Sequence, residues 1–258
     1  MFIDSHSHLN HEDFINNIDE YLSEAKSGNV DAFLCVGWDV ISSINAIKIA
    51  EKYDNVYAAI GIHPSDVLKA SIEDFSKIES LVNHPKVVAI GEIGLDFYWN
   101  KEQKDKDIQI DWFKRFLSLA NRYHKPVVIH SRDAIDLTYQ ILKENIVESK
   151  GVIHCYQAGK DYVKRYVELG YYFGIGGVAT YKNALSLKEA IKIIPIDRLL
   201  LETDAPYLAP SPYRGSKNHS KYIPLIASEI ALLKGINVDD IEKCSTSNFY
   251  NLFNRSKK

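Results

Sequence analysis

The sequence is poor in the residues that stabilise secreted proteins. It has three cysteines in 258 residues (Cys35, Cys155 and Cys244), and none of them forms a CxxC pair. An odd, scattered set of cysteines indicates a reducing compartment and no disulfide framework. The chain also begins without a basic segment followed by an apolar one, the pattern typical of a secretory leader. We therefore expect a cytoplasmic protein.

Two further absences narrow the class of protein. No apolar run approaches the roughly 20 residues of a membrane span, so we expect no association with a membrane. Lysine and arginine together number 31 against 34 aspartates and glutamates, for a formal net charge of −3. This balance argues against an extended basic surface for duplex DNA. It still allows a small phosphate-binding cleft in which a metal ion supplies the positive charge.

What the chain does contain is a regular alternation of apolar, β-rich runs with amphipathic stretches. The runs that we expect to be strands are Met1–Ser5, Ala32–Val36, Val56–Ile60, Val87–Ile90, Val127–Ile129, Val152–Ile153, Tyr171–Ile175 and Leu199–Leu201. Helical spacing of apolar residues marks Ile41–Tyr53, Trp112–Tyr123, Leu185–Ile194 and Tyr222–Lys234. Both patterns are those of buried strands and of helices that cover them.

About eight such units without a linker predict a single α/β domain over residues 1–258, folded as a (β/α)₈ TIM-type barrel. We expect a closing helix or two within Val238–Phe253 and a solvated tail at Arg255–Lys258. A doubly wound open sheet is the alternative. It is less favoured because no GxGxxG motif follows the first strand.

Histidines and acids stand at the ends of the expected strands. His6 and His8 end the first strand, and strand alternation points both imidazoles the same way. Taken alone, this pair is as readily two buried polar groups as a metal site. The residues that follow the later strands are His63, Glu92 and Asp96, His130 and Arg132, His154, and Asp204. Barrels of this kind build their active sites at that face.

These residue types suit divalent metal ions. Six residues are too many ligands for one catalytic ion, and they match two ions that share a bridging carboxylate. These residues are His6, His8, His130, His154, Glu92 and Asp204. Glu92 is the expected bridge, and Asp204 can both bind metal and accept a proton from water. Simpler structural interpretations stay open: Asp204 as a helix cap, His63 as a residue that orders the turn before Pro64. The aromatic run Phe97-Tyr98-Trp99 fits either base stacking or loop packing.

Six segments together resemble the TatD family of metal-dependent hydrolases, which belongs to the amidohydrolase-like barrels. They are Phe2–His8, Gly61–Pro64, Gly91–Asp96, His130–Arg132, His154–Tyr156 and Glu202–Pro206. The resemblance implies an ester-bond hydrolase that needs two divalent ions (Zn, Mn or Mg). It implies a deoxyribonuclease, acting as an exonuclease on single-stranded DNA ends, that cleaves phosphodiesters with a metal-bridging hydroxide. We expect a monomer.

By position, the resemblance places His6, His8, Glu92 and Asp204 around one ion. It places Glu92, His130 and His154 around the other, with Glu92 shared and with His63 close to the bound phosphate. Glu92, Asp204 and His63 are therefore the expected catalytic residues. The candidate substrate contacts are Arg132, Asp96, Arg214 and Asn218.

One loop departs from the family pattern, where Arg-Gly-Lys-Arg-Asn-Glu-Pro is usual. Here residues 214–220 read Arg-Gly-Ser-Lys-Asn-His-Ser, so Arg214 and Asn218 are kept and the end of the motif differs. Because this loop would contact substrate, a second function stays open: a metal-dependent ester or amide hydrolase, such as a D-aminoacyl-tRNA deacylase. A non-catalytic metal-binding barrel is disfavoured, because no ligand is missing.

Overall fold

Strands and helices alternate along the chain in the computed structural model, which describes residues 1–253. The strands are β1 (Phe2–Ser7), β2 (Val30–Val36), β3 (Val56–Ile60), β4 (Val87–Asp96), β5 (Val127–Arg132), β6 (Gly151–Ile153), β7 (Tyr172–Ile175) and β8 (Leu199–Leu201). The helices are α1 (Ile18–Ser27), α2 (Val40–Lys52), α3 (Ile72–Leu81), α4 (Gln103–Arg122), α5 (Ile135–Glu144), α6 (Lys160–Glu168), α7 (Leu185–Ile193), α8 (Ile223–Lys234) and α9 (Val238–Phe253). Short 3₁₀ turns are η1 (Gly177–Thr180), η2 (Ile196–Arg198) and η3 (Ser220–Tyr222).

The strands form one eight-stranded sheet in the order β1 to β8. This order, with helices between successive strands, is that of the predicted (β/α)₈ barrel. The chain divides into two compact units: the first contains Met1–Leu34 and the chain from Cys155 onward, and the second contains Cys35–His154. Each unit is described by itself below.

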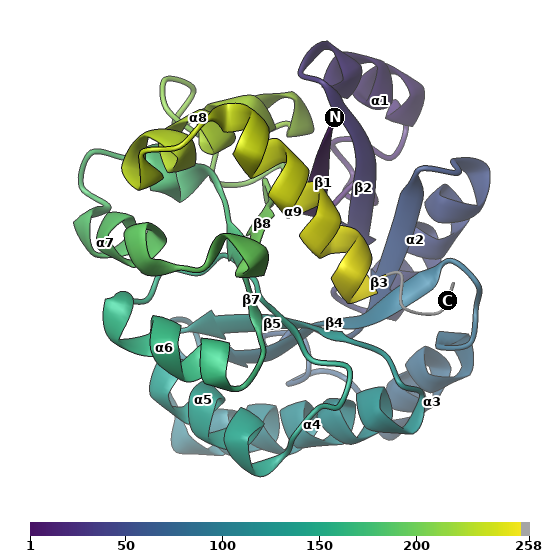
Figure 1. The fold of residues 1–258 in the computed structure, drawn as a ribbon. Helices are drawn as coiled ribbons and strands as arrows, with labels where there is room; N and C mark the ends of the chain where they lie inside the picture. The colour runs from purple at the N-terminus through teal and green to yellow at the C-terminus, as the bar shows by residue number, and fades with distance from the viewer. Residues whose placement is uncertain (254–258) are drawn as a thin grey trace. The chain divides into compact units, whose positions relative to one another are not determined.

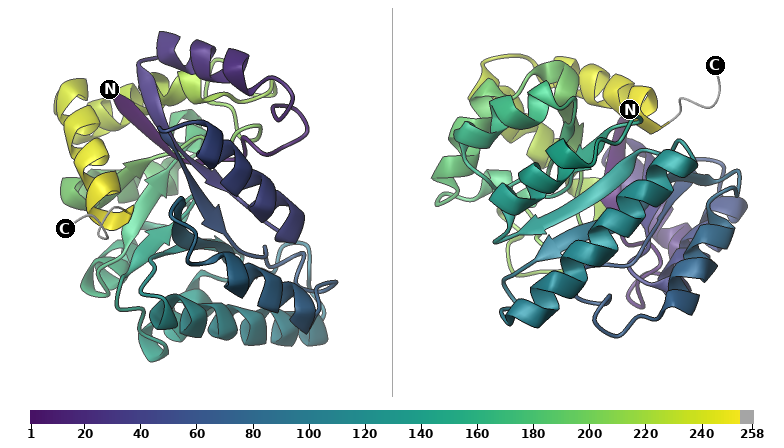
Figure 2. Two further views of the ribbon diagram at one scale, coloured as in Figure 1. Left: turned by 90° about the vertical axis from the view of Figure 1, so that its right-hand side faces the viewer. Right: turned by 90° about the horizontal axis from the view of Figure 1, so that it is seen from below.

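In the second unit, the strands β3 to β6 pair in parallel. The pairing of β4 with β5 continues to Gly94 opposite His130 and Asp96 opposite Arg132. α4 packs on β4, as Figure 2 shows. It buries Phe113, Phe116 and Leu117, whose spacing of three and four residues places them on one face of the helix.

In the first unit, β7 pairs in parallel with β8, and β8 is followed by a bridge between Ser7 and Ala205 that brings β1 alongside. The helix α9 closes the amino ends of these strands (Figure 1). The Asn248 side chain donates to the carbonyl of Leu199 at 2.8 Å, and the hydroxyl of Thr246 donates to the carbonyl of Met1 at 3.0 Å. The predicted closing helix is therefore confirmed.

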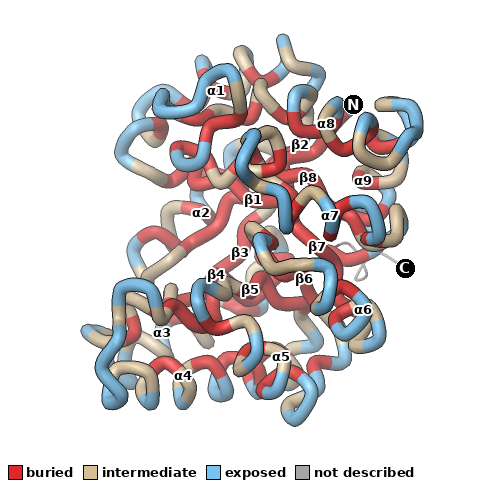
Figure 3. The backbone as a smooth tube through the Cα atoms, turned by 90° about the vertical axis from the view of Figure 1, so that its left-hand side faces the viewer, coloured by how far each residue is buried: buried red, intermediate tan, exposed pale blue. Residues whose placement is uncertain are grey.

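The core of each unit consists of its strands and the inner faces of its helices (Figure 3). All ten residues of β4 are buried, as are all six of β1. Apolar side chains fill the middle of the strands, and buried polar residues gather toward their carboxyl ends. This distribution places the chemistry of the chain where the strands end.

All eight predicted strand runs overlap observed strands, but several boundaries were wrong. β1 continues to Ser7 and β5 to Arg132, beyond the expected Ser5 and Ile129. We expected β4 to end at Ile90, and it continues to Asp96 because its last residues still pair with β5. Glu92 therefore lies inside a strand. The helix expected from Trp112 begins earlier, at Gln103. The prediction missed its first turns because they are mostly polar and show no helical spacing of apolar residues. The tail expected at Arg255–Lys258 lies outside the described residues.

Within residues 1–253, no helix combines the length and the apolar content needed to cross a membrane.

Candidate metal centre

In the second unit, three imidazoles surround one carboxylate. The Oε1 atom of Glu92 lies 2.7 Å from Nδ1 of His130, 3.8 Å from Nε2 of His63 and 3.7 Å from Nε2 of His154. The His63 and His130 rings meet edge to face, with centroids 4.4 Å apart. We call these four residues the Glu92 group.

The strands of the second unit position the Glu92 group. Glu92 and His130 lie on the paired strands β4 and β5, and His154 directly follows β6 with its N–H donating to the carbonyl of Ile129 at 2.9 Å. Gly94 lets β4 and β5 approach here, since a Cβ atom at this position would lie 2.0 Å from the carbonyl oxygen of His130. Its φ of 142° is also one that L side chains rarely adopt.

A second carboxylate holds the other side of the His130 ring. Oδ2 of the buried Asp96 lies 3.2 Å from Nε2 of His130, while Glu92 contacts Nδ1. Burial lowers the pKa of His130, but the hydrogen bonds to Asp96 and Glu92 outweigh it and raise the pKa to about 9. Burial likewise raises the pKa of Asp96, and contact with His130 reverses that effect, so its pKa is lowered. A carboxylate on the far nitrogen is the usual partner of a metal-binding histidine.

In the first unit, His6 and His8 both face Asp204. Oδ1 of Asp204 lies 3.6 Å from Nε2 of His6 and 3.3 Å from Nε2 of His8. The two rings meet edge to face with centroids 5.0 Å apart. As predicted from strand alternation, the His-x-His pair presents both imidazoles to one place. We call these three residues the Asp204 group.

The backbone of β1 holds the Asp204 group together. The N–H of Asp204 donates to the carbonyl of His6 at 2.9 Å, and the N–H of His8 donates to the carbonyl of Ala205 at 2.9 Å. Asp204 itself has a φ of 59°, in the left-handed region that few residues other than glycine adopt. The hydrogen bond to His6 sets its position, and no helix begins directly after it, since the next helical element is η3 at Ser220.

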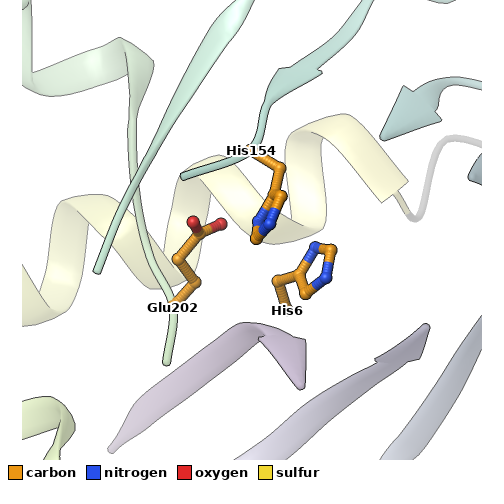
Figure 4. Close-up of side chains that lie close together, drawn as sticks. All are labelled: His6, His154 and Glu202. Atoms are coloured by element: carbon orange, nitrogen blue, oxygen red, sulfur yellow. The ribbon is translucent and has the colours of Figure 1, made fainter. Parts of the chain in front are cut away.

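Glu202 is a buried acid of the first unit that the sequence reasoning did not select. Its carboxylate lies near the imidazole of His6 of the same unit, with a ligand atom of each within 4.8 Å of the other (Figure 4). Oε1 of Glu202 accepts a hydrogen bond from the N–H of Cys155 at 2.6 Å. Strand alternation could have identified it, because Glu202 and Asp204 are two residues apart.

The four expected substrate contacts divide into two exposed and two buried residues. The guanidinium of Arg132 lies 3.9 Å from the ring centroid of Tyr98, and that of Arg214 lies 4.4 Å from that of Tyr181. Both arginines are exposed.

Asn218 and Asp96 are buried instead. The side-chain amide of Asn218 donates to the carbonyls of Thr203 and Tyr207, at 2.7 Å each, so it holds the loop after β8. Asp96 holds His130, as described above. The polar atoms of these two side chains are hydrogen-bonded to the protein, and their contact with substrate stays a prediction.

Both groups have donor atoms and spacings that fit a divalent ion. Two ligands each about 2.1 Å from the same ion lie at most about 4.2 Å apart. The histidine–carboxylate distances of 2.7 to 3.8 Å in the two groups meet this limit. Ligand atoms of His63, Glu92 and His130 also lie within 4.8 Å of one another, so His63 belongs with the possible ligands. Imidazole and carboxylate donors at the strand ends of a (β/α)₈ barrel are typical of a metal-dependent enzyme.

Comparison with known proteins gives the family. The model of the family described as TatD related DNase matches residues 3–254. The protein named uncharacterized metal-dependent hydrolase YabD, from Bacillus subtilis (strain 168), is 40% identical over 254 residues, covering 98% of this chain and 99% of that protein. YcfH of Escherichia coli (strain K12), named in the same way, is 33% identical and covers 98% and 96%. This chain belongs to the TatD-related DNase family and is a metal-dependent hydrolase.

Solved structures agree with this assignment. The crystal structure of YjjV, a TatD homolog from Escherichia coli K12, matches with a TM-score of 0.94 and 30% identity, covering 98% of each chain. A TatD family hydrolase from Entamoeba histolytica matches with a TM-score of 0.86 and 26% identity, covering 98% of this chain and 97% of that one. The predicted TIM-type barrel and the predicted family are both confirmed.

Proposed function

We propose that this hydrolase is a deoxyribonuclease that removes nucleotides from the ends of single-stranded DNA. The observation that carries the proposal is the arrangement at the end of β5, where the exposed guanidinium of Arg132 follows His130 by two residues. A guanidinium beside a metal-binding group suits a phosphodiester, because it contacts phosphate oxygens through two parallel hydrogen bonds. The family description supports the same substrate.

We propose that two divalent ions (Zn, Mn or Mg) are held by His6, His8, His130, His154, Glu92 and Asp204. Such ions lower the pKa of water and neutralise charge on a phosphate under attack. Glu92 contacts three imidazoles with one carboxylate oxygen, which supports its assignment as a metal ligand, and in the proposal it is the ligand that the two ions share. His63, 3.8 Å from the same oxygen, stands where it can contact either an ion or a phosphate oxygen.

The carboxylate of Asp204 is the proposed acceptor of the proton from the attacking water. Its side chain is partly exposed, whereas Glu92 is buried. A general base must reach solvent-derived water, and it acts best when a neighbouring group fixes its orientation. The backbone pairing with His6 and the two imidazoles provide that orientation. We propose that Arg132 and Arg214 bind the phosphates of the strand, while Asp96 and Asn218 hold the groups around them.

The test is cleavage of an end-labelled single-stranded DNA oligonucleotide by metal-stripped protein, with Mg²⁺, Mn²⁺ or Zn²⁺ added back in turn. Metal-dependent shortening from one end is the expected result and gives the polarity. Two bound ions by elemental analysis with no cleavage under any metal would reject the nuclease function. Hydrolysis of D-aminoacyl-tRNA or of simple esters by the wild-type protein would then support the alternative function, that of an ester hydrolase.

A further inference from the structure

An exposed aromatic surface lies at the carboxyl ends of β4 and β5. Trp99 is 69% exposed and Tyr98 is 41% exposed, although both are large aromatic residues. Their rings meet edge to face with centroids 4.7 Å apart. The guanidinium of Arg132 lies 3.9 Å from the centroid of the Tyr98 ring and 5.7 Å from that of Trp99. The two rings and this guanidinium form what we call the Trp99 platform.

The Trp99 platform is tied to the Glu92 group through one residue. Oδ1 of Asp96 accepts hydrogen bonds from the N–H groups of Tyr98 at 3.0 Å and Trp99 at 3.3 Å. Oδ2 of the same carboxylate contacts Nε2 of His130. The N–H of Phe97 also donates to the carbonyl of Arg132 at 2.9 Å. Asp96 therefore joins the backbone that carries the platform to His130, a proposed metal ligand.

Loop packing does not explain the exposure of Trp99. Phe97 is the least exposed of the three aromatic residues, and the ammonium of Lys106 lies 4.9 Å from its ring centroid. Trp99 contributes little to the core, since most of its surface is open to water. The two interpretations of the aromatic run thus separate by residue: Phe97 packs the loop, and Tyr98 and Trp99 present their rings to solvent.

We propose that the Trp99 platform is a subsite that stacks a nucleobase of the single-stranded substrate, with Arg132 contacting the adjoining phosphate. This inference rests on the proposed function and deepens it. Aromatic rings stack on any base through its π face, which makes such binding tolerant of sequence. A guanidinium stacked on a tyrosine keeps its edge N–H groups available for phosphate. With a net charge of −3, the chain has little excess charge for a long backbone track, so stacking must supply much of the affinity.

The first experiment measures cleavage of a single-stranded DNA oligonucleotide and of a set of strands that each lack one base. In the metal-loaded wild type, loss of the base at one position relative to the cleaved bond should raise KM about ten-fold, within the range known for one stacked base. Trp99→Ala should raise KM for the intact strand by a similar factor, with little change in kcat. Removing the same base should then have no further effect in Trp99→Ala.

The control variants separate stacking from loss of structure. Trp99→Phe keeps a flat ring and should recover most of the affinity. Tyr250→Ala removes an exposed aromatic residue of α9 and should leave KM unchanged. Equal KM values for the wild type and Trp99→Ala, in an active nuclease, would overturn the subsite and leave the proposed function standing.

A binding measurement keeps the subsite testable even if the wild type cleaves no DNA. Deoxyadenosine monophosphate should quench the tryptophan fluorescence of the metal-loaded protein, and deoxyribose 5-phosphate, which lacks the base, should not. Quenching that disappears in Trp99→Phe would support base stacking on Trp99 although the nuclease function had failed. Absence of base-dependent quenching in an inactive wild type would overturn both.

Discussion

Asp4 and Thr203 connect β1 to the segment that carries Asp204. Oδ1 of Asp4 accepts a hydrogen bond from the N–H of Thr203 at 3.0 Å, and Oδ2 accepts one from the Thr203 hydroxyl. Oδ2 also accepts from the hydroxyl of Ser220 at 2.6 Å. Burial raises the pKa of Asp4 to about 7, against these hydrogen bonds, which lower it. One buried carboxyl group thus holds both ends of the loop between β8 and α8.

Asp4→Asn should reduce the free energy of unfolding by about 1–3 kcal/mol, because the new amide presents N–H donors to groups that need an acceptor. Urea unfolding of the metal-free protein measures this loss. Asp31→Asn is the matched control in the same unit. Asp31 is more exposed, and its Oδ1 lies 3.9 Å from Nζ of Lys26, so the substitution should have little effect on stability. Unchanged stability in Asp4→Asn would mean that its hydrogen bonds are replaced without cost.

His219 should make stability depend on pH in the acidic range. Burial, with help from the charge of Lys221 and against that of Glu24, lowers the pKa of His219 to about 4. A histidine with a lowered pKa favours the folded state above its unfolded pKa of about 6.5, and this contribution is lost as the pH falls from about 6.5 to about 4. The loss amounts to at most about 3 kcal/mol.

His219→Gln tests this prediction, because glutamine does not titrate. Loss of the stacking between His219 and Tyr21, whose ring centroids lie 3.8 Å apart, lowers stability by an amount that does not vary with pH. The difference in unfolding free energy between wild type and His219→Gln should therefore shrink as the pH falls from 7 to 4.5. A constant difference would contradict the lowered pKa.

Asp96→Asn should weaken metal binding about 10- to 100-fold, because the outer partner of a metal-binding histidine orients the ring and increases its basicity. Competition with a fluorescent chelator measures the affinity. Asp107→Asn, on the exposed face of α4, should leave it unchanged. Equal affinities in the two variants would show that His130 needs no help from Asp96.

Glu92→Gln should remove hydrolase activity and lower the number of bound ions. The change keeps the shape of the side chain but removes the negative charge that three imidazoles share. Elemental analysis counts the ions, and oligonucleotide or ester cleavage reports activity. Circular dichroism should show an intact fold. A variant that retains both ions and full activity would exclude Glu92 from the mechanism.

The local pattern of the sequence was enough to find the strands and to select most of the histidines and acids that the Glu92 group and the Asp204 group contain. His6 and His8 face the same way because a strand alternates its side chains, which needs no tertiary information. Glu92 was predicted at a strand end and lies within β4, since strand length here depends on pairing with β5. Glu202 was missed, although its spacing of two residues from Asp204 is a local signal that could have identified it.

The roles of the substrate candidates depended on burial, which the sequence does not encode directly. Asn218 and Arg214 belong to one loop, yet Asn218 donates to two backbone carbonyls while Arg214 is exposed. Asp96 and Arg132 end neighbouring strands, and again only the arginine is open to solvent. Each polar side chain bonds to the groups that folding brings close to it, and those groups are distant in sequence.

The sequence by itself determined the alternating strands and helices and the barrel class, which follow from periodicity over a few neighbouring positions. It also indicated the family, through the resemblance of its motifs, and the residues that we expect to bind metal. Tertiary structure alone decided that Asp96 holds His130, that Asp4 holds the segment before Asp204, and that Trp99 is exposed while Phe97 packs. Such contacts join separate strands and loops, so they exist only once the chain has folded and its buried polar groups have found partners.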